Sequence, residues 1–129
     1  MTGKEYISLD KLDTYKLARQ LSKTAWLIYE KLDWQMKKIM SDQFIESTDS
    51  VAANIAEGFG RFHYLDKVKF YYNSRGSLLE SRHWFDLLKE RKLILKEDQI
   101  QYLEYYPQLR PSLNALINSV MDRKGDRNP

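Results

Sequence analysis

Residues 50–61 read SVAANIAEGFGR and join a run of small residues to a turn that carries two glycines. Val51 and Ile55 lie four positions apart, which is the spacing of one face of a helix. Glycine just past a last helical turn can adopt the left-handed conformation that closes a helix, so Gly58 is predicted to end this one. The stretch therefore divides the chain into long helices on either side of a glycine break.

Long helices are predicted throughout the chain. Apolar residues recur at spacings of three and four, and glycine and proline number only 5 and 3 in 129 residues. No segment alternates apolar and polar residues with β-branched enrichment, so no sheet is predicted. The predicted helices cover residues 9–31, 35–57, 64–92 and 97–121, followed by a frayed tail at 122–129.

Two helix ends carry further predictions. Ser8 or Asp10 is expected to cap the first helix, because short polar side chains bind the free N–H groups of a first turn. Pro107 and Pro111 fall inside the fourth apolar pattern. Proline in a helix interior removes a hydrogen bond and costs about 3 kcal/mol, so we expect a kink or a break between residues 105 and 112.

Length and composition fit one globular domain. The chain is 43% hydrophobic and 30% charged. Four helices of roughly 22 residues, each about 33 Å long, predict a single all-α domain over residues 1–129, folded as an antiparallel up-down-up-down four-helix bundle. There is no cysteine, which excludes disulfides and a thiol nucleophile. The chain shows no secretory signal and no apolar run that could span a membrane, so a cytoplasmic protein without a membrane partner is predicted.

Five polar residues form one line on the second predicted helix, at spacings of four, three, four and three: Gln43, Ser47, Ser50, Asn54 and Glu57. A solvated face normally carries Lys and Glu, whereas Ser and Asn are small and uncharged. The line is therefore interpreted as a close-packed, hydrogen-bonded seam that fixes helix register. This structural role is preferred to a catalytic one.

Glycine also interrupts the third predicted helix. Gly76 costs about 1 kcal/mol there relative to alanine, which suggests that another helix passes close by. Glu80, one turn later, is expected to form a polar bridge within the bundle, with three candidate partners: Asn54, Arg61 and Arg75.

The titratable residues do not predict catalysis. His63 and His83 lie twenty residues apart, without the spacing of a metal site. No Ser–His–Asp group or paired metal-binding carboxylates can be recognised. We therefore predict no catalytic residues, no metal and no cofactor, and a protein that is not an enzyme. An enzyme acting through Asn54, Glu57 and Glu80 stays as the weakest alternative.

These motifs resemble the bacterial four-helix-bundle family named after the 23S rRNA intervening sequences that encode some of its members. The family pattern is a glutamine, then Ser-aliphatic-x-x-Asn-Ile-Ala-Glu-Gly-x-Gly-Arg, then Gly-Ser-x-x-Glu, and the resemblance covers about residues 10–120. The motif residues, interpreted as structural, are Gln43, Ser50, Val51, Asn54, Ile55, Ala56, Glu57, Gly58, Gly60, Arg61, Gly76, Ser77 and Glu80. Residues 46–49 read ESTD where relatives are basic, so that face receives no nucleic-acid role.

The resemblance implies an antiparallel four-helix bundle that assembles into a homopentameric ring. The family is also similar to the accessory protein of diversity-generating retroelements, which binds nucleic acid and works with a reverse transcriptase. RNA or DNA, and a reverse transcriptase or another protein, are therefore implied partners. Relatives encoded in intervening sequences have no settled activity.

Basic residues are concentrated on two predicted helices. Residues 61–95 carry eight Lys or Arg against four Asp or Glu, whereas residues 36–60 carry two against four. A basic stripe can bind a phosphate backbone without reading bases, although an ordinary solvated face is the competing interpretation. The candidate nucleic-acid-binding residues are Lys16, Arg19 and Lys23 on the first helix and Arg75, Arg82 and Lys89 on the third.

The function predicted from these patterns is a non-enzymatic, homo-oligomeric scaffold that binds RNA or DNA nonspecifically. The alternative is a protein-interaction adaptor with no nucleic-acid ligand. Three observations suggest this alternative: the small net charge of +3, the acidic second helix and an aromatic content of 13%. Tyr and Trp are enriched at interfaces, so Trp34, Tyr105 and Tyr106 are expected to lie in one.

Overall fold

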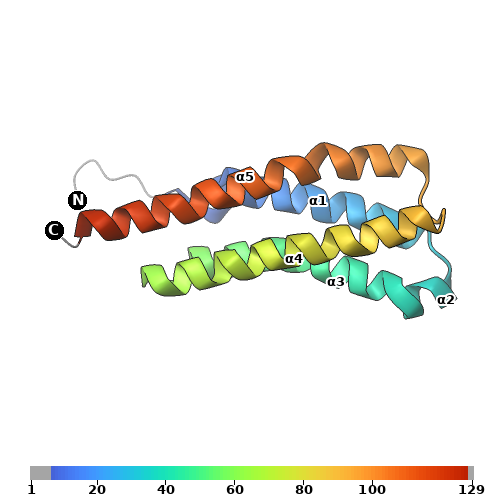
Figure 1. The fold of residues 1–129 in the computed structure, drawn as a ribbon, viewed down its shortest axis with the longest axis horizontal. Helices are drawn as coiled ribbons and strands as arrows, with labels where there is room; N and C mark the ends of the chain where they lie inside the picture. Colours follow the sequence, from blue (N-terminus) through green and yellow to red (C-terminus); the bar gives the residue numbers. More distant parts are fainter. Residues whose placement is uncertain (1–6, 128–129) are drawn as a thin grey trace.

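Four long helices form an antiparallel bundle in the computed structural model, which describes residues 7–127 (Figure 1). They are α1 (Asp13–Glu30), α3 (Asp42–Phe59), α4 (Tyr64–Glu90) and α5 (Lys96–Arg127). α1 packs against α3 and α5, and α4 packs against the same two helices, so α1 and α4 lie across the bundle from each other. The predicted all-α, up-down-up-down four-helix fold is confirmed.

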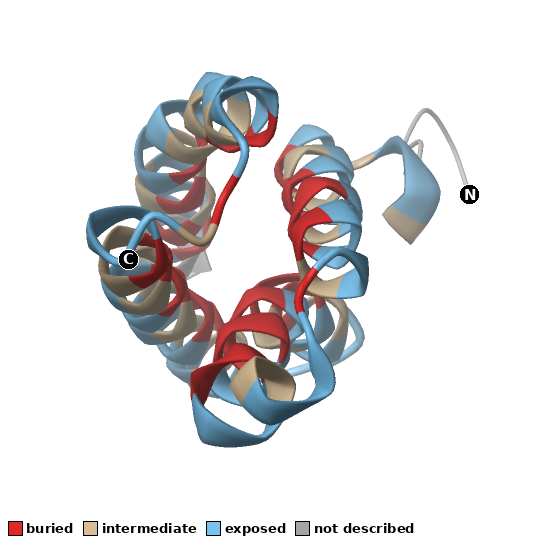
Figure 2. Cartoon of the chain, turned by 90° about the vertical axis from the view of Figure 1, so that its right-hand side faces the viewer, coloured by how far each residue is buried: buried red, intermediate tan, exposed pale blue. Residues whose placement is uncertain are grey.

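The core is built from the apolar stripe of each helix, and Figure 2 shows the buried residues facing the interior of the bundle. Its centre is aromatic. Phe44, Phe85 and Tyr102 are fully buried. The rings of Phe85 and Tyr102 stack with centroids 4.0 Å apart, and Phe44 lies 5.9 Å from Tyr102. Each such ring pair adds about 1 kcal/mol beyond the burial of its area.

A buried chain of hydroxyl groups ties three helices together. Thr48 Oγ1 lies 2.6 Å from Ser81 Oγ, which lies 2.8 Å from the hydroxyl of Tyr102. Ser74, one heptad before Ser81, donates a 2.7 Å hydrogen bond to the carbonyl of Val51. These contacts were not predicted from the sequence. Two serines seven residues apart on the apolar face of the third predicted helix could have indicated them.

The first helix begins later than predicted. Residues 9–11 form a short 3₁₀ turn, η1 (Leu9–Lys11), and α1 starts only at Asp13. Ser8 hydrogen-bonds the Asp10 carboxylate rather than a backbone N–H, and neither residue caps α1. The capping prediction was wrong because the chain bends at Leu12, which is extended with ψ of 117°.

The second predicted helix is not a regular α-helix at its start. It opens with α2 (Trp34–Met36), continues as a π-helical turn, η2 (Lys37–Ser41), and becomes α-helical in α3. Asp33 caps α2 through a 2.9 Å hydrogen bond from the N–H of Met36. The hydroxyl of Ser41 donates to the carbonyl of Met36, five residues back. A π turn holds one extra residue and therefore rotates the side chains that follow it.

Gly58 does not close α3 in a left-handed conformation. It lies inside the helix and is buried, and Gly60 follows as the C-cap with a right-handed φ of −79°. The reason for glycine is space. A Cβ at Gly58 would lie 2.7 Å and 2.9 Å from two ring carbons of Tyr71 and 3.1 Å from the carbonyl oxygen of Lys67. α3 and α4 thus lie close together at a point where one of them has no side chain.

The end of α4 carries a left-handed residue that is not glycine. Lys92 has φ of 59°. Its N–H donates to the carbonyl of Lys89, and the N–H of Leu93 donates to Leu88, each at 2.9 Å. This is the Schellman arrangement, in which glycine is usual because a Cβ is strained there.

Replacing Lys92 by glycine is therefore expected to raise the free energy of unfolding by about 1 kcal/mol, because it removes the left-handed strain. Urea unfolding followed by circular dichroism measures the change. Lys89→Gly is the matched control and should lower the stability by about 1 kcal/mol, since Lys89 lies in the helix. A Lys92→Gly protein less stable than the wild type would contradict this account of the turn.

α5 runs through both prolines without a break. It extends from Lys96 to Arg127 as one helix, so it also includes most of the predicted frayed tail, whose last two residues lie outside the described part of the chain. Figure 1 shows that α5 bends in its orange part. Pro107 and Pro111 are exposed, whereas Leu109 and Leu113 are fully buried. Burial of this face outweighs the two lost hydrogen bonds.

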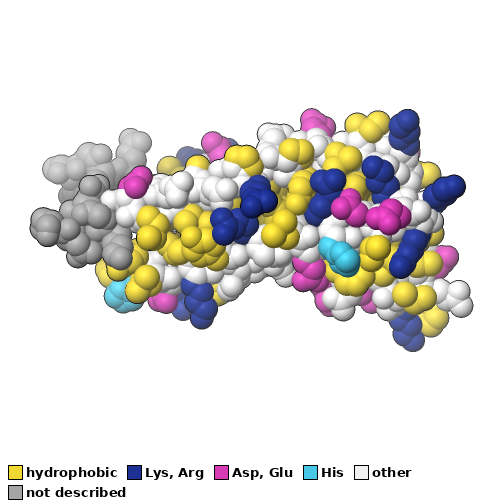
Figure 3. All heavy atoms as spheres, in the orientation of Figure 1, with side chains coloured by type: hydrophobic (Ala, Val, Ile, Leu, Met, Phe, Trp, Pro, Cys, Tyr) yellow, Lys and Arg dark blue, Asp and Glu magenta, His cyan; other side chains and the backbone are white. Residues whose placement is uncertain are grey.

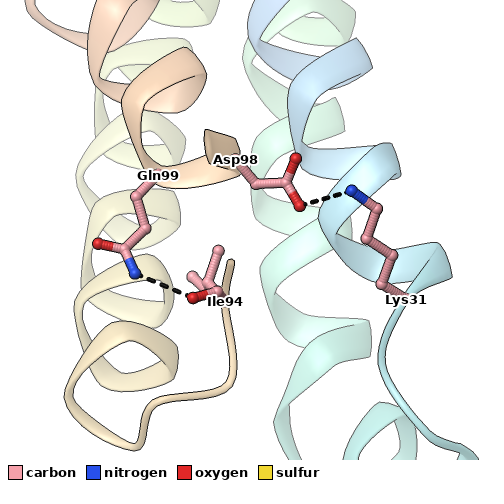
Figure 4. A network of polar contacts seen from close by, with 4 residues as sticks. All are labelled: Lys31, Ile94, Asp98 and Gln99. Carbon is pink, nitrogen blue, oxygen red and sulfur yellow. Dashed lines mark hydrogen bonds and ion pairs between the residues drawn. The ribbon is translucent and has the colours of Figure 1, made fainter. Parts of the chain in front are cut away.

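An ion pair fastens α1 to the start of α5 (Figure 4). Lys31 Nζ lies 2.9 Å from Asp98 Oδ2, and the hydrogen bond to Asp98 raises the pKa of Lys31. Beside it, Gln99 donates a 3.0 Å hydrogen bond to the carbonyl of Ile94. Among residues 7–127, no helix is long and apolar enough to cross a membrane.

Candidate nucleic-acid interface

Two arginines of the predicted α4 stripe lie at the boundary between α4 and α5. Arg75 donates a 2.8 Å hydrogen bond to Asn114 Oδ1 of α5, and its guanidinium carbon lies 4.7 Å from the ring centroid of Tyr72. Arg82 lies 5.0 Å from the ring centroid of Tyr106, also on α5. The contacts across this boundary fix both guanidinium groups in place.

Both fixed arginines keep spare hydrogen-bond donors, and Arg82 also forms an ion pair with Asp86. Arg82 Nε donates to Asp86 Oδ1 at 2.8 Å, and this hydrogen bond raises the pKa of Arg82. A guanidinium has five N–H groups, so one hydrogen bond and a ring contact leave most of them available. Lys89, one heptad further, is exposed. Figure 3 shows Lys and Arg side chains on this face and toward its right-hand end.

The predicted α1 stripe is not a single basic surface, and it lies across the bundle from α4. Arg19 donates a 2.9 Å hydrogen bond to the hydroxyl of Tyr15 in a groove between α1 and α3. Lys23 lines the other groove, between α1 and α5, beside Glu104. Lys16 Nζ lies 3.8 Å from Asp13 Oδ1. Arg19 and Lys23 therefore line grooves on different sides of α1, whereas Arg75 and Arg82 both lie along the boundary of α4 and α5.

The polar line on α3 is not a buried seam within the chain. Gln43 and Glu57 are exposed. Asn54 donates to the carbonyl of Ser50 at 2.9 Å, and Glu57 pairs with Arg61 at 3.1 Å, so these contacts stay within α3 and its C-terminal end. Ser47 is buried, and its hydroxyl donates to the carbonyl of Phe44 in the same helix. The line as a whole does not form the predicted seam, because the face of α3 that meets α4 lies one position further on and uses Thr48 and Val51.

Glu80 does not bridge to any of its three predicted partners. It accepts a 3.1 Å hydrogen bond from the indole N–H of Trp84, one turn along α4. Gly76 is exposed, and no atom lies within 4 Å of a Cβ built there, so no helix of this chain passes close to it. Ser77, its neighbour, is half-buried.

These contacts do not form a catalytic group. Asn54 and Glu80 form hydrogen bonds within their own helices, and Glu57 pairs with Arg61 just past the end of α3, so the partners of these three residues are not one another. In residues 7–123, no three His, Asp or Glu side chains gather as a metal site. Among the aromatic residues expected at an interface, Trp34 is 70% exposed, whereas Tyr105 and Tyr106 are half-buried.

A family profile described as 23S rRNA-intervening sequence protein matches residues 10–115. The chain belongs to this family. A solved structure with the same fold is a protein of unknown function from the S23 ribosomal protein family of Bacteroides thetaiotaomicron. It is 20% identical, with a TM-score of 0.74 over 81% of this chain and 97% of that one. No curated protein matches the sequence.

Membership agrees with the motif resemblance, and the structure shows what the motif does within one chain. Gly58 permits the close crossing of α3 and α4. Gly60 and Arg61 shape the end of α3, where Lys67 Nζ also donates to the carbonyls of Gly58 and Phe59 at 3.3 Å and 2.9 Å. No other segment of residues 7–127 packs against Gly76. No catalytic activity is named for the family or for the similar solved structure.

Proposed function

We propose that this protein is a homo-oligomeric helical scaffold that binds RNA or DNA through the phosphate backbone without reading bases. The observation that carries the proposal is the α4 line, in which Arg75 and Arg82 are held in place and Lys89 continues the charge at heptad spacing. Fixed guanidinium groups match phosphate oxygens well and lose little entropy on binding.

Backbone binding has a simple test. The affinity for a labelled, mixed-sequence RNA should fall linearly with the logarithm of the salt concentration, because bound phosphates release counterions. RNA and DNA single strands of equal length should bind with similar affinity, since no base edges are read. Fluorescence anisotropy from about 50 mM to about 300 mM salt measures both properties. Undetectable binding at the lowest salt would overturn the proposal.

Self-association is proposed on a second surface, the outer stripe of α4. Leu65, Tyr72 and Leu79 recur every seven residues and are 65%, 46% and 51% exposed. Heptad spacing is the pattern of a seam that packs against another helix. Gly76 lies between the last two residues and is open, so a second backbone can approach there. A second copy of the chain thus supplies the helix that Gly76 was predicted to contact. Five chains per ring is the number that the family resemblance implies.

Replacing Leu79 by aspartate is expected to break up the assembly, because a carboxylate without a partner is costly to bury. Multi-angle light scattering should then give the 15.4 kDa of a single chain, where the wild type gives a multiple of it. Leu95→Asp is the matched control, since Leu95 is similarly exposed at 53% but lies outside the stripe. An unchanged mass for Leu79→Asp would remove the stripe from the interface.

A protein-interaction adaptor is the second candidate function, and the same exposed stripe favours it. The stripe would then hold another protein, such as the reverse transcriptase that the resemblance implies, instead of a second copy. The mass of the wild-type protein discriminates between the two. A single chain that binds no RNA but captures a purified reverse transcriptase would favour the adaptor.

A further inference from the structure

The net charge of the chain is concentrated at one end of the bundle. Residues 31–41 and 89–98 form this end, which is named here the α2 end. They carry seven Lys or Arg against four Asp or Glu, a net of +3 that equals the formal charge of the whole chain. Two of the four acids are engaged, Asp33 as the cap of α2 and Asp98 with Lys31. The rest of the chain is neutral, so an anionic ligand is drawn to this end.

Two aromatic platforms accompany the charge: Trp34 within the α2 end, and the stack of Trp26 on Tyr29 in the last two turns of α1, which lead into that end. Trp34 is 70% exposed, and Lys38 Nζ lies 4.7 Å from its ring centroid. Trp26 is 49% exposed and stacks on Tyr29 at 5.3 Å and an interplanar angle of 22°. Lys37 Nζ lies 4.8 Å from the ring centroid of Tyr29. Each of two consecutive lysines therefore places its ammonium group beside one of these aromatic platforms.

Both lysines belong to the π-helical turn η2. In this turn Lys38 and Ile39 are exposed, while Met40 and Ser41 are buried. Such turns are rare and are frequent at functional sites. The nearby Asp42 accepts a 2.7 Å hydrogen bond from the hydroxyl of Tyr29, which orients that ring.

We infer that the α2 end binds single-stranded nucleic acid, with bases stacking on Trp34 and Trp26 and phosphates binding Lys37 and Lys38. Aromatic platforms interleaved with cations are how proteins hold single strands, because every base has a face that can stack. A duplex keeps those faces inside its own stack. The inference rests on the proposed nucleic-acid binding and adds to it the strand type and a second contact region besides the α4 line.

Charge and geometry favour nucleic acid over an anionic membrane surface. Exposed Ile39 and Leu95 lie at the same end and would suit lipid. However, the Lys38 ammonium lies beside the face of Trp34, 4.7 Å from the ring centroid, where an acyl chain would offer it no partner. An ammonium beside a stacking face instead fits a base and its phosphate.

Tryptophan fluorescence tests the site directly, since the chain has three tryptophans. In a Trp26→Phe, Trp84→Phe protein only Trp34 reports. We expect its emission to be quenched by oligothymidylate, an unstructured single strand, much less by a duplex of equal phosphate content, and to recover in high salt. The matched control, Trp26→Phe with Trp34→Phe, leaves Trp84 on α4 and should show no quenching.

Affinity measurements provide the second arm of the test. Trp34→Ala should weaken oligothymidylate binding by about tenfold. Lys37→Gln with Lys38→Gln should reduce the salt slope by about 1.4, because each single-strand phosphate contact contributes about 0.7. Full affinity of both variants, with no quenching of Trp34, would overturn the inference while the proposed function stands.

Two other outcomes are equally decisive. No binding of any oligonucleotide at low salt would overturn the proposed function and the inference together. A blue shift of Trp34 emission with phosphatidylserine vesicles, without quenching by oligothymidylate, would replace the inferred ligand by a membrane surface.

Discussion

Replacing Gly58 by alanine is expected to lower the free energy of unfolding by about 2 kcal/mol, the typical cost of overpacking a tight contact. The new methyl carbon would lie 2.7 Å from a ring carbon of Tyr71, which is 1% exposed and has no free space to move into. It would also lie 3.1 Å from the Lys67 carbonyl oxygen, so α3 and α4 must separate. Urea unfolding followed by circular dichroism measures the loss.

Gly60→Ala is the matched control for this prediction. Gly60 lies only two residues from Gly58, but the nearest atom to a Cβ at position 60 is 3.6 Å away. Its φ of −79° can be adopted by any residue. Its stability should stay close to that of the wild type. If Gly58→Ala is as stable as Gly60→Ala, the close crossing of α3 and α4 is not what requires glycine at position 58.

Replacing Arg75 and Arg82 together by glutamate is expected to weaken binding of single-stranded RNA by roughly sixtyfold at about 50 mM salt. The figure follows from counterion release. Each lost phosphate contact lowers the salt slope by about 0.7, and two contacts act over the twentyfold range between about 50 mM and about 1 M. Fluorescence anisotropy at several salt concentrations gives both the affinity and the slope.

The control for the arginine pair has the same change of charge on the opposite side of the bundle. Lys16→Glu with Lys23→Glu should weaken binding far less, because those residues do not form one surface with the α4 line. Circular dichroism must show both variants folded, since glutamate at Arg82 repels Asp86 one turn away. Equal losses for the two pairs would mean that overall charge, and not the α4 line, governs binding.

The helices themselves could be predicted from sequence because periodic burial is a local property. The predicted ranges 64–92 and 97–121 start within one residue of α4 and α5. Exceptions arose where packing overrides local preference. The buried faces of Leu109 and Leu113 hold α5 together across two prolines. The π turn at Lys37–Ser41 adds one residue to a helix without any change in its apolar pattern.

The candidate sites were less predictable, because periodicity shows which residues share a face and not what that face meets. Gly58 was predicted to end the second helix, whereas it lies inside α3 and leaves space for the ring of Tyr71. Gly76 was predicted to contact a helix of the bundle and is open. The α4 arginines could be found from their heptad spacing. The contacts of Lys37 with Tyr29 and of Lys38 with Trp34 could not, because they join residues of separate segments that no sequence periodicity connects.

We propose that the protein is a self-assembled bundle that binds the phosphates of nucleic acid. The mass of the purified particle tests this proposal most directly. Multi-angle light scattering with absorbance at 260 and 280 nm should be recorded after nuclease treatment, in low and high salt, and again after adding RNA. We expect the mass of the particle in high salt to be a multiple of 15.4 kDa. The particle should gain RNA in low salt and release it in high salt. A particle of 15.4 kDa that gains no RNA at any salt concentration would contradict it.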